Sequence, residues 1–190
     1  MKAVWSYDSC LTPEQCEQAI AIGLALPSQE GTVGYKSSDP DSSHVDQSIR
    51  SSTISWLSRS DSSLSWLFSL IDHKVSLLTD HWHHIRYFYQ GCDSLQFTSY
   101  SPGHYYNSHI DYSPRPDYSP VRKVSASVLL SPPDSFKGGS LVIDGGSIPT
   151  SNLMQGQITV FPSIINHHVT PVTEGTRYSL VAWYKGPPWI

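Results

Sequence analysis

Two potential metal ligands stand two residues apart in the segment YSPGHYYNSHIDY, residues 100–112. They are His109 and Asp111, and the segment is predicted to be extended. Because successive side chains of a strand alternate between its faces, the imidazole and the carboxylate would point the same way. One more histidine would complete the set of two histidines and one carboxylate that holds Fe(II) with positions open for reaction. His167 is the candidate.

The C-terminal segment, GQITVFPSIINHHVTPVTEGTRYSLVAWY, adds two further groups in β-rich sequence. Arg177 follows His167 by ten positions, and Ser179 lies two residues beyond it, so the last two would share one face of a strand. A planar guanidinium can hold a carboxylate through two parallel hydrogen bonds, and a neighbouring hydroxyl adds another donor. This pair would suit a substrate or cosubstrate that carries a carboxylate.

These residues resemble a known family. The segment LQFTSYSPGHYYNSHIDY is similar to the Y-x-x-G-x-x-Y-x-x-H-x-D pattern of the prolyl 4-hydroxylase branch of the iron(II)- and 2-oxoglutarate-dependent dioxygenases. The positions that fit this pattern are Tyr100, Gly103, Tyr106, His109 and Asp111. The tail looks like the second part of the same site, through His167, Val169, Pro171, Val172, Gly175, Arg177, Ser179 and Trp183. The resemblance covers roughly residues 95 to 185.

The resemblance implies roles for nine residues. The catalytic metal ligands would be His109, Asp111 and His167; 2-oxoglutarate would contact Arg177, Tyr100 and Ser179; the substrate groove would contain Tyr106, Lys123 and Trp183. Arg177 is a departure, because prolyl 4-hydroxylases of the collagen type often carry Lys there. Tyr100, Tyr106 and Trp183 could equally be packing residues. Of the adjacent His167 and His168, strand alternation allows one to face inward, and the family spacing selects His167.

The implied activity is hydroxylation of proline in a peptide or protein, with Fe(II) as cofactor and 2-oxoglutarate as cosubstrate, releasing succinate and CO2. The resemblance leaves open whether ascorbate is required. Two alternatives remain. The first is a 2-oxoglutarate-dependent hydroxylase of a free amino acid or small metabolite, and the second is a non-catalytic jelly-roll that binds a metal or ligand only. The sequence does not indicate an oligomeric state.

The predicted elements form a helical N-terminal part and a β-rich C-terminal part. A helix is expected from Thr12–Pro13–Glu14 to about Leu26, because Thr is a favoured N-cap and Pro a favoured first residue. A second, of about twenty residues, is expected after Asp61, and strands are expected over residues 3–8, 49–57 and 85–90. Further short strands follow at regular spacing, separated by Gly/Pro turns.

Such a pattern predicts an α+β protein. The family resemblance implies a double-stranded β-helix, or jelly-roll, with N-terminal helices packed on one sheet. With 190 residues, a single domain is expected. Residues 1–84 would be the helical support region and residues 85–190 the jelly-roll core.

Composition excludes several other classes. Twelve basic against sixteen acidic residues, without a basic run, argue against nucleic-acid binding. No stretch reaches the roughly 20 apolar residues of a membrane span, and no signal peptide is recognisable. Three cysteines, without a C-x-x-C pair, argue against a disulfide framework. We therefore expect a soluble, cytoplasmic protein with no membrane partner.

Two segments carry ambiguous signals. His81, His83 and His84 could share a metal, but they stand where helix passes to strand, without a carboxylate in register, so they are left out of the site. Residues 113–122 contain three prolines, which suits a loop rather than a sheet interior. This loop could gate substrate entry or be an inert surface connection.

Overall fold

The computed structural model describes most of the chain. The described residues are 6–33, 44–80, 82, 85, 91–112, 120–144, 146–147 and 154–188. His81, His83 and His84, the predicted strand at 86–90 and most of the proline-bearing loop lie outside these ranges. The three cysteines are unpaired, in agreement with the absence of a predicted disulfide framework. Within the described part of the chain, neither helix has the length and apolar character that a membrane crossing would need.

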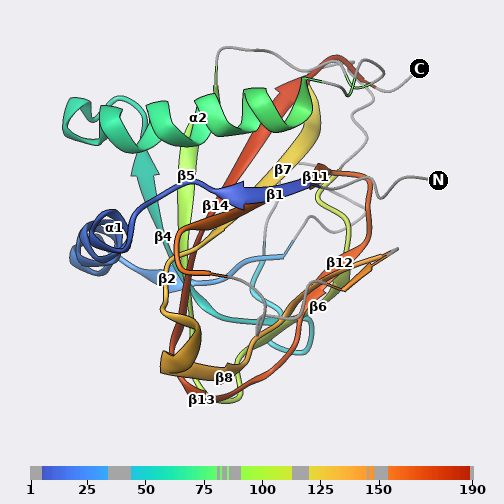
Figure 1. The fold of residues 1–190 in the computed structure, drawn as a ribbon. Coiled ribbons are helices and arrows are strands. Elements are labelled where there is room, and N and C mark those ends of the chain that lie inside the picture. The colour runs from blue at the N-terminus through green and yellow to red at the C-terminus, as the bar shows by residue number, and fades with distance from the viewer. Residues whose placement is uncertain are drawn as a thin grey trace.

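Seven antiparallel strands form the large sheet (Figure 1). Their spatial order is β1 (Ser6–Ser9), β11 (Gln157–Pro162), β7 (Val121–Leu129), β14 (Arg177–Gly186), β5 (Ser94–Tyr100), β4 (Thr53–Ser58) and β2 (Gln29–Glu30). The central strand β14 pairs with β7 on one side and β5 on the other. Strands that are far apart in sequence are therefore brought together around the strand that begins with Arg177.

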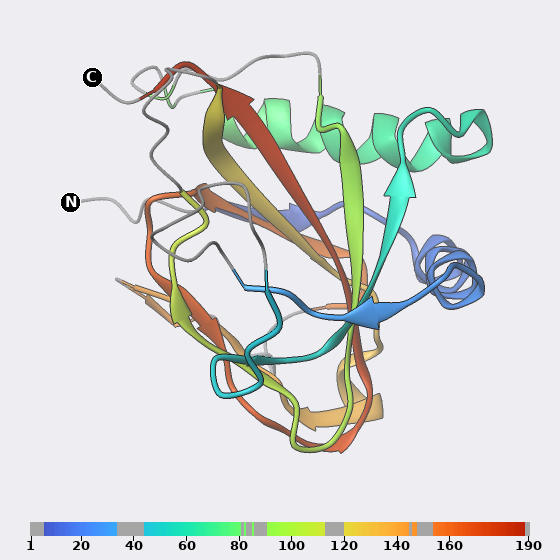
Figure 2. The same cartoon turned by 180° about the vertical axis from the view of Figure 1, so that it is seen from behind.

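A smaller sheet of five strands lies on the other side of the molecule from the helices (Figure 2). Its order is β10 (Gly146–Ser147), β9 (Leu141–Ile143), β12 (His167–Val169), β6 (Tyr105–His109) and β3 (Arg50–Ser51). A separate two-stranded sheet is formed by β8 (Phe136–Gly138) and β13 (Val172–Gly175), which are antiparallel. An apolar cluster joins the two sheets: Tyr100, Leu141, Ile143, Phe161, Val169 and Val172.

Both predicted helices are present. α1 (Pro13–Ala25) begins as predicted, because the Thr12 side chain accepts from the Gln15 backbone and the Gln15 side chain accepts from Thr12, a capping box. α2 (Ser65–Thr79) is shorter than expected, because Asp61 caps a 3₁₀ turn, η1 (Ser62–Leu64), that precedes it. The buried faces of the two helices share one hydrophobic cluster with the large sheet, which includes Cys16, Ala19, Leu67, Phe68, Ile71, Leu95, Phe97 and Leu180.

One strand prediction was wrong. The single strand expected over residues 49–57 is two strands in different sheets: β3 pairs with β6 in the small sheet, and β4 pairs with β5 in the large one. The chain crosses between the sheets at Ser52, which is buried. The sequence pattern does not reveal such a crossing, because polar and apolar residues alternate in the same way in both strands. The crossing brings Arg50 beside Tyr106.

Candidate active site

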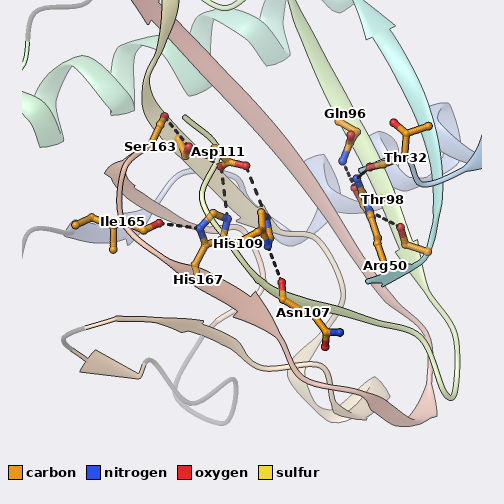
Figure 3. Close-up of polar contacts among 12 residues, drawn as sticks. Thr32, Arg50, Gln96, Thr98, Asn107, His109, Asp111, Ser163, Ile165 and His167 are labelled. Carbon is orange, nitrogen blue, oxygen red and sulfur yellow. Dashed lines mark hydrogen bonds and ion pairs between the residues drawn. The ribbon is translucent and has the colours of Figure 1, made fainter. Parts of the chain in front are cut away.

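The two predicted histidine ligands face each other across neighbouring strands. His109 is the last residue of β6 and His167 the first of β12, and the two are direct partners in the antiparallel register. Asp111 lies just beyond β6, where its backbone N–H donates to Ser163 O at 3.0 Å. Their candidate ligand atoms all lie within 4.8 Å of one another (Figure 3). The structure thus brings together three groups that are distant in sequence.

The backbone orients both imidazole rings. Nδ1 of His109 lies 2.7 Å from Asn107 O, and Nδ1 of His167 lies 3.1 Å from Ile165 O. When Nδ1 donates its proton to a carbonyl, the lone pair is on Nε2. The two Nε2 atoms point toward Asp111, at 3.7 Å and 3.5 Å from its carboxylate oxygens. Both rings therefore present the atom that would bind a metal.

The surroundings of His109 and Asp111 favour the protonation states that bind a metal. Burial, together with the nearby His167, lowers the pKa of His109 to about 4. Burial acts to raise the pKa of Asp111, but His167, Arg122 and His109 outweigh it, so the pKa of this carboxyl is below its usual value. A neutral imidazole and an ionised carboxylate are the binding forms of these ligands.

The three groups fit a divalent transition metal. Two imidazoles and one carboxylate form the donor set of non-haem Fe(II) sites with open positions. An ion about 2.1 Å from two ligand atoms would leave them roughly 3.0–3.4 Å apart. The spacings of 3.5 Å and 3.7 Å between the Nε2 atoms and the carboxylate oxygens would need to close by about 0.1–0.7 Å. Among the described residues no other cluster of three such groups is present.

A hydroxyl supports the carboxylate ligand. Ser125 Oγ donates to Asp111 Oδ2 at 2.7 Å and lies 2.9 Å from Ser163 Oγ. Groups that orient a ligand typically contribute 10- to 100-fold to metal affinity. We therefore expect Ser125→Ala to weaken Fe(II) or Mn(II) binding about tenfold, measured by anaerobic titration. Ser135→Ala, at an exposed serine that bonds only to Pro132 O, should leave the affinity unchanged. Equal affinities in the two variants would contradict this support role.

A cavity of about 170 Å³ opens beside the three groups, between the two sheets. Its lining is a mixture of aromatic, aliphatic and a few charged side chains: Thr32, Val33, Arg50, Trp56, Gln96, Tyr100, Tyr106, His109, Asp111, Arg122, Ala126, Ser127, Leu141, Phe161, His167, Val169, Arg177, Ser179, Val181 and Trp183. Eight of the nine predicted site residues are among them. A mostly apolar cavity with a few convergent polar groups is typical of ligand sites.

Arg177 is a buried cation in this cavity, with 2% of its surface exposed. Nη1 donates to Ser179 Oγ at 3.0 Å, whereas Nε has no partner among the described residues. Burial lowers the pKa of Arg177. A Cβ on Gly139 would lie 3.0 Å from Arg177 Cδ, so glycine leaves room for this side chain. An unneutralised buried guanidinium is costly, and a carboxylate ligand would complete its interactions.

Aromatic rings enclose the candidate metal ligands. The Tyr106 ring stacks on His109 with 3.6 Å between centroids, and Phe161 meets His167 edge-on at 4.7 Å. Tyr100 lies with its ring centroid 5.7 Å from the Arg177 guanidinium carbon. His168 is half-buried and lines a different groove, so the structure supports the choice of His167 as the inward residue.

Lys123 is the one predicted site residue that does not line the cavity. It is buried, but its neighbour Arg122 is the lining residue, with its guanidinium carbon 3.8 Å from the centroid of Trp183. The register of β7 with β14 shifts here, so that Tyr184 pairs with Val124 but Lys185 pairs with Arg122. A bulge of this kind changes which side chain faces inward, and the sequence alone does not reveal it.

Sequence analysis also missed Arg50 and Trp56, which line the same cavity. Both belong to the segment IRSSTISWL, residues 49–57, which was expected to be a strand and was given no functional role. The sequence did contain an indication of a functional role, because Arg50 and Trp56 are the charged and the large aromatic residue at the two ends of SSTIS, residues 51–55. Their placement in the cavity depends on the crossing at Ser52, which was not foreseen.

Comparison with known proteins identifies relatives for the C-terminal half of the chain. Residues 95–185 match the family model described as the 2OG-Fe(II) oxygenase superfamily. A PKHD-type hydroxylase of Xanthomonas campestris is 40% identical over 96 residues, which are 47% of this chain and 42% of the relative. The chain therefore spans less than half the length of this curated relative.

Two solved structures share the fold over nearly the whole chain. A viral collagen prolyl hydroxylase from Paramecium Bursaria Chlorella virus-1, in complex with 2OG, has a TM-score of 0.68 at 17% identity, over 97% of each chain. A prolyl hydroxylase from Trichoplax adhaerens, in complex with a hypoxia inducible factor peptide fragment, has a TM-score of 0.65 at 17% identity, over 96% of this chain and 84% of that one. The predicted jelly-roll fold is therefore confirmed by the overall similarity to these two structures.

Proposed function

Because residues 95–185 match the family model described as the 2OG-Fe(II) oxygenase superfamily, we propose that this chain belongs to that family and is an Fe(II)- and 2-oxoglutarate-dependent dioxygenase. Its substrate would be proline in a peptide or protein. The observation that carries this proposal is the convergence of His109, Asp111 and His167 at one end of a cavity that also contains the buried Arg177. The relative named a PKHD-type hydroxylase is consistent with it.

The metal would be held by His109, Asp111 and His167. When bound, Fe(II) supplies the redox chemistry by which one oxygen atom of O2 enters a C–H bond and the other enters succinate as 2-oxoglutarate loses CO2. The protein orients the two imidazoles through Asn107 O and Ile165 O. Tyr106 and Phe161, packed on the imidazoles, exclude water from that side of the ligands.

The cosubstrate would be anchored by Arg177 and Ser179. The guanidinium would take the far carboxylate of 2-oxoglutarate through charge-assisted hydrogen bonds, and its burial strengthens them by lowering the local dielectric. Tyr100 lines the same part of the cavity and is a further candidate contact. Positioning of this kind is the main contribution that a protein makes to cofactor chemistry.

A peptide substrate is supported by the cavity wall and by the fold. The guanidinium of Arg122 lies over the ring of Trp183. The rings of Trp183 and Trp56 have centroids 6.2 Å apart, and Trp56 is 40% exposed. Aromatic surfaces of this kind suit proline-containing segments. One structural neighbour is named a collagen prolyl hydroxylase and another holds a peptide fragment. Tyr106 and Trp183 would contact the substrate, and the predicted contribution of Lys123 stays a prediction.

We also propose that the chain acts as one catalytic domain. Residues 85–190 would be the jelly-roll core and residues 1–84 its helical support. This assignment rests on the hydrophobic cluster that the two helices share with the large sheet. β3 and β4 lie in the first unit but pair with β6 and β5 of the second, and they supply Arg50 and Trp56 to the cavity.

The proposal is tested by incubation with Fe(II), 2-oxoglutarate and a library of proline-containing peptides, with and without ascorbate. We expect succinate release coupled to a gain of one oxygen atom on proline. Oxidation of free amino acids but not of peptides would move the substrate to the small-metabolite alternative. A protein that binds Fe(II) but never consumes 2-oxoglutarate would contradict the dioxygenase assignment and favour a binding-only jelly-roll.

A further inference from the structure

The cavity contains a second buried cation that the proposed chemistry does not use. Arg50 lies on β3, is only 5% exposed and lines the cavity on the side of Tyr106. Figure 3 shows it across from the three candidate metal ligands, with Thr32. Arg177 already suffices for the far carboxylate of 2-oxoglutarate. A second buried guanidinium therefore calls for a separate explanation.

Neutral groups hold Arg50 in place without offsetting its charge. Nε donates to Ser52 Oγ at 2.8 Å, and Nη1 donates to Thr32 O at 3.0 Å. The guanidinium carbon lies 4.7 Å from the centroid of the Tyr106 ring, a cation–π contact. Of the five N–H donors of an arginine, these contacts occupy two. The side chain is therefore oriented, while three donors have no hydrogen-bond partner among the described residues.

No carboxylate neutralises Arg50 among the described residues. The acidic groups on adjoining segments are already engaged: Glu30, which is exposed, accepts from Gln47, and Asp46 accepts from Ser48. Asp111, in the same cavity, lies beside His109 and His167. None of the three makes an ion pair with Arg50, in contrast to Arg59, which pairs with Asp72 at 2.7 Å. Isolated buried charges are strongly disfavoured. A buried arginine with only neutral partners beside a cavity is therefore positioned for an anion.

We propose that Arg50 binds a carboxylate of the substrate, so that the enzyme selects proline with an acidic group close to it. This inference rests on the proposed function. Arg50 is separated from the ligand His109 by one stacked ring, Tyr106, at 3.6 Å from that imidazole. A substrate that presents its reacting carbon to the metal could reach Arg50 with a nearby carboxylate. The single charge of Arg50 matches a carboxylate better than the nearly double charge of a phosphate group.

The carboxylate could be an acidic side chain in a peptide or the free carboxyl group of a terminal or free proline. An acidic side chain as the source is tested with C-terminally amidated peptides. Each carries Glu at one of the three positions on either side of proline, and each is compared with the same peptide carrying Gln there. Free proline against prolinamide, and peptides with free against amidated C-termini, test the second. Binding is followed by tryptophan fluorescence under anaerobic conditions with Fe(II) and 2-oxoglutarate, and turnover by oxygen gain.

We expect one acidic placement to bind about 10- to 100-fold more tightly than its neutral twin, the range for a charge-assisted contact. Arg50→Gln should bring this ratio close to one. Arg50→Lys should retain part of it, because the charge stays but the planar fork is lost. Lys137→Gln removes an exposed cation that pairs with Glu174, and should leave the ratio as in wild type.

The ratio compares two ligands within one protein, so it is insensitive to a partial loss of folded protein in a variant. The inference would be overturned if the wild-type protein bound the Glu and Gln peptides equally tightly at every placement. It would also be overturned if Arg50→Gln changed only the affinity for 2-oxoglutarate. Failure of the proposed function has a different signature: acidic ligands still bind preferentially, but no oxygen is gained by any of them.

Discussion

His109→Ala should abolish the oxidation of peptide substrates and weaken Fe(II) binding by more than the roughly 100-fold upper range expected for loss of a supporting group. The substitution removes one of three ligand atoms that lie within 4.8 Å of one another. It also removes the ring on which Tyr106 stacks. Metal affinity is measured by anaerobic titration with Mn(II) or Fe(II), and activity by succinate release.

The matched control is His168→Ala. His168 is adjacent to the ligand His167 but lines a groove outside the cavity, so its removal should leave metal affinity and turnover near wild type. A variant at His168 that lost metal binding while His109→Ala kept it would reverse the assignment of the ligands. Circular dichroism of both variants separates loss of a ligand from loss of the fold.

Arg177→Met should raise the concentration of 2-oxoglutarate needed for half-maximal turnover about 100-fold. Each charge-assisted hydrogen bond contributes about 1.5–3 kcal/mol, and about 1.4 kcal/mol corresponds to a factor of ten. The same substitution should not lower the free energy of unfolding of the cosubstrate-free protein, because methionine replaces a buried charge that has no carboxylate partner among the described residues. The first quantity is measured kinetically and the second by urea denaturation.

Arg177→Lys is the informative companion variant. It retains the positive charge but cannot form two parallel hydrogen bonds, so its cosubstrate requirement should lie between wild type and Arg177→Met. If 2-oxoglutarate were bound equally well by all three proteins, Arg177 would not be the anchor. If only the affinity for the peptide changed, the roles assigned to Arg177 and Arg50 would need to be exchanged.

Much of the site could be predicted from the sequence because the relevant patterns are local. His109 and Asp111 face inward together, while Ile110 between them is 47% exposed, which is the alternation expected of extended chain. Likewise, Arg177 and Ser179 share a face because they are two residues apart on β14. Thr12 and Pro13 marked the start of α1 for the same reason, since the N-cap and the first helical residue are adjacent in the sequence.

The remainder depends on contacts between distant segments. The direct pairing of His109 with His167 joins β6 to β12 across 58 positions, and only the family resemblance indicated it. The crossing at Ser52 and the register shift beside Lys123 change which side chains reach the cavity. Both are set by how one strand packs against another, so neither leaves a mark in the hydrophobic pattern of the strand itself.

From Arg177 to Tyr184, the two faces of β14 contact different parts of the protein. Arg177, Ser179, Val181 and Trp183 line the cavity, whereas Leu180, Ala182 and Tyr184 pack in the cluster shared with the helices. Six residues at about 3.3 Å each separate Arg177, the proposed cosubstrate anchor, from Trp183 by roughly 20 Å. The strand therefore fixes the distance between Arg177 and Trp183. A substitution at Trp183 would change the contacts with the substrate without changing this distance. Deletion of one residue between them would turn Trp183 toward the helices and remove its ring from the cavity.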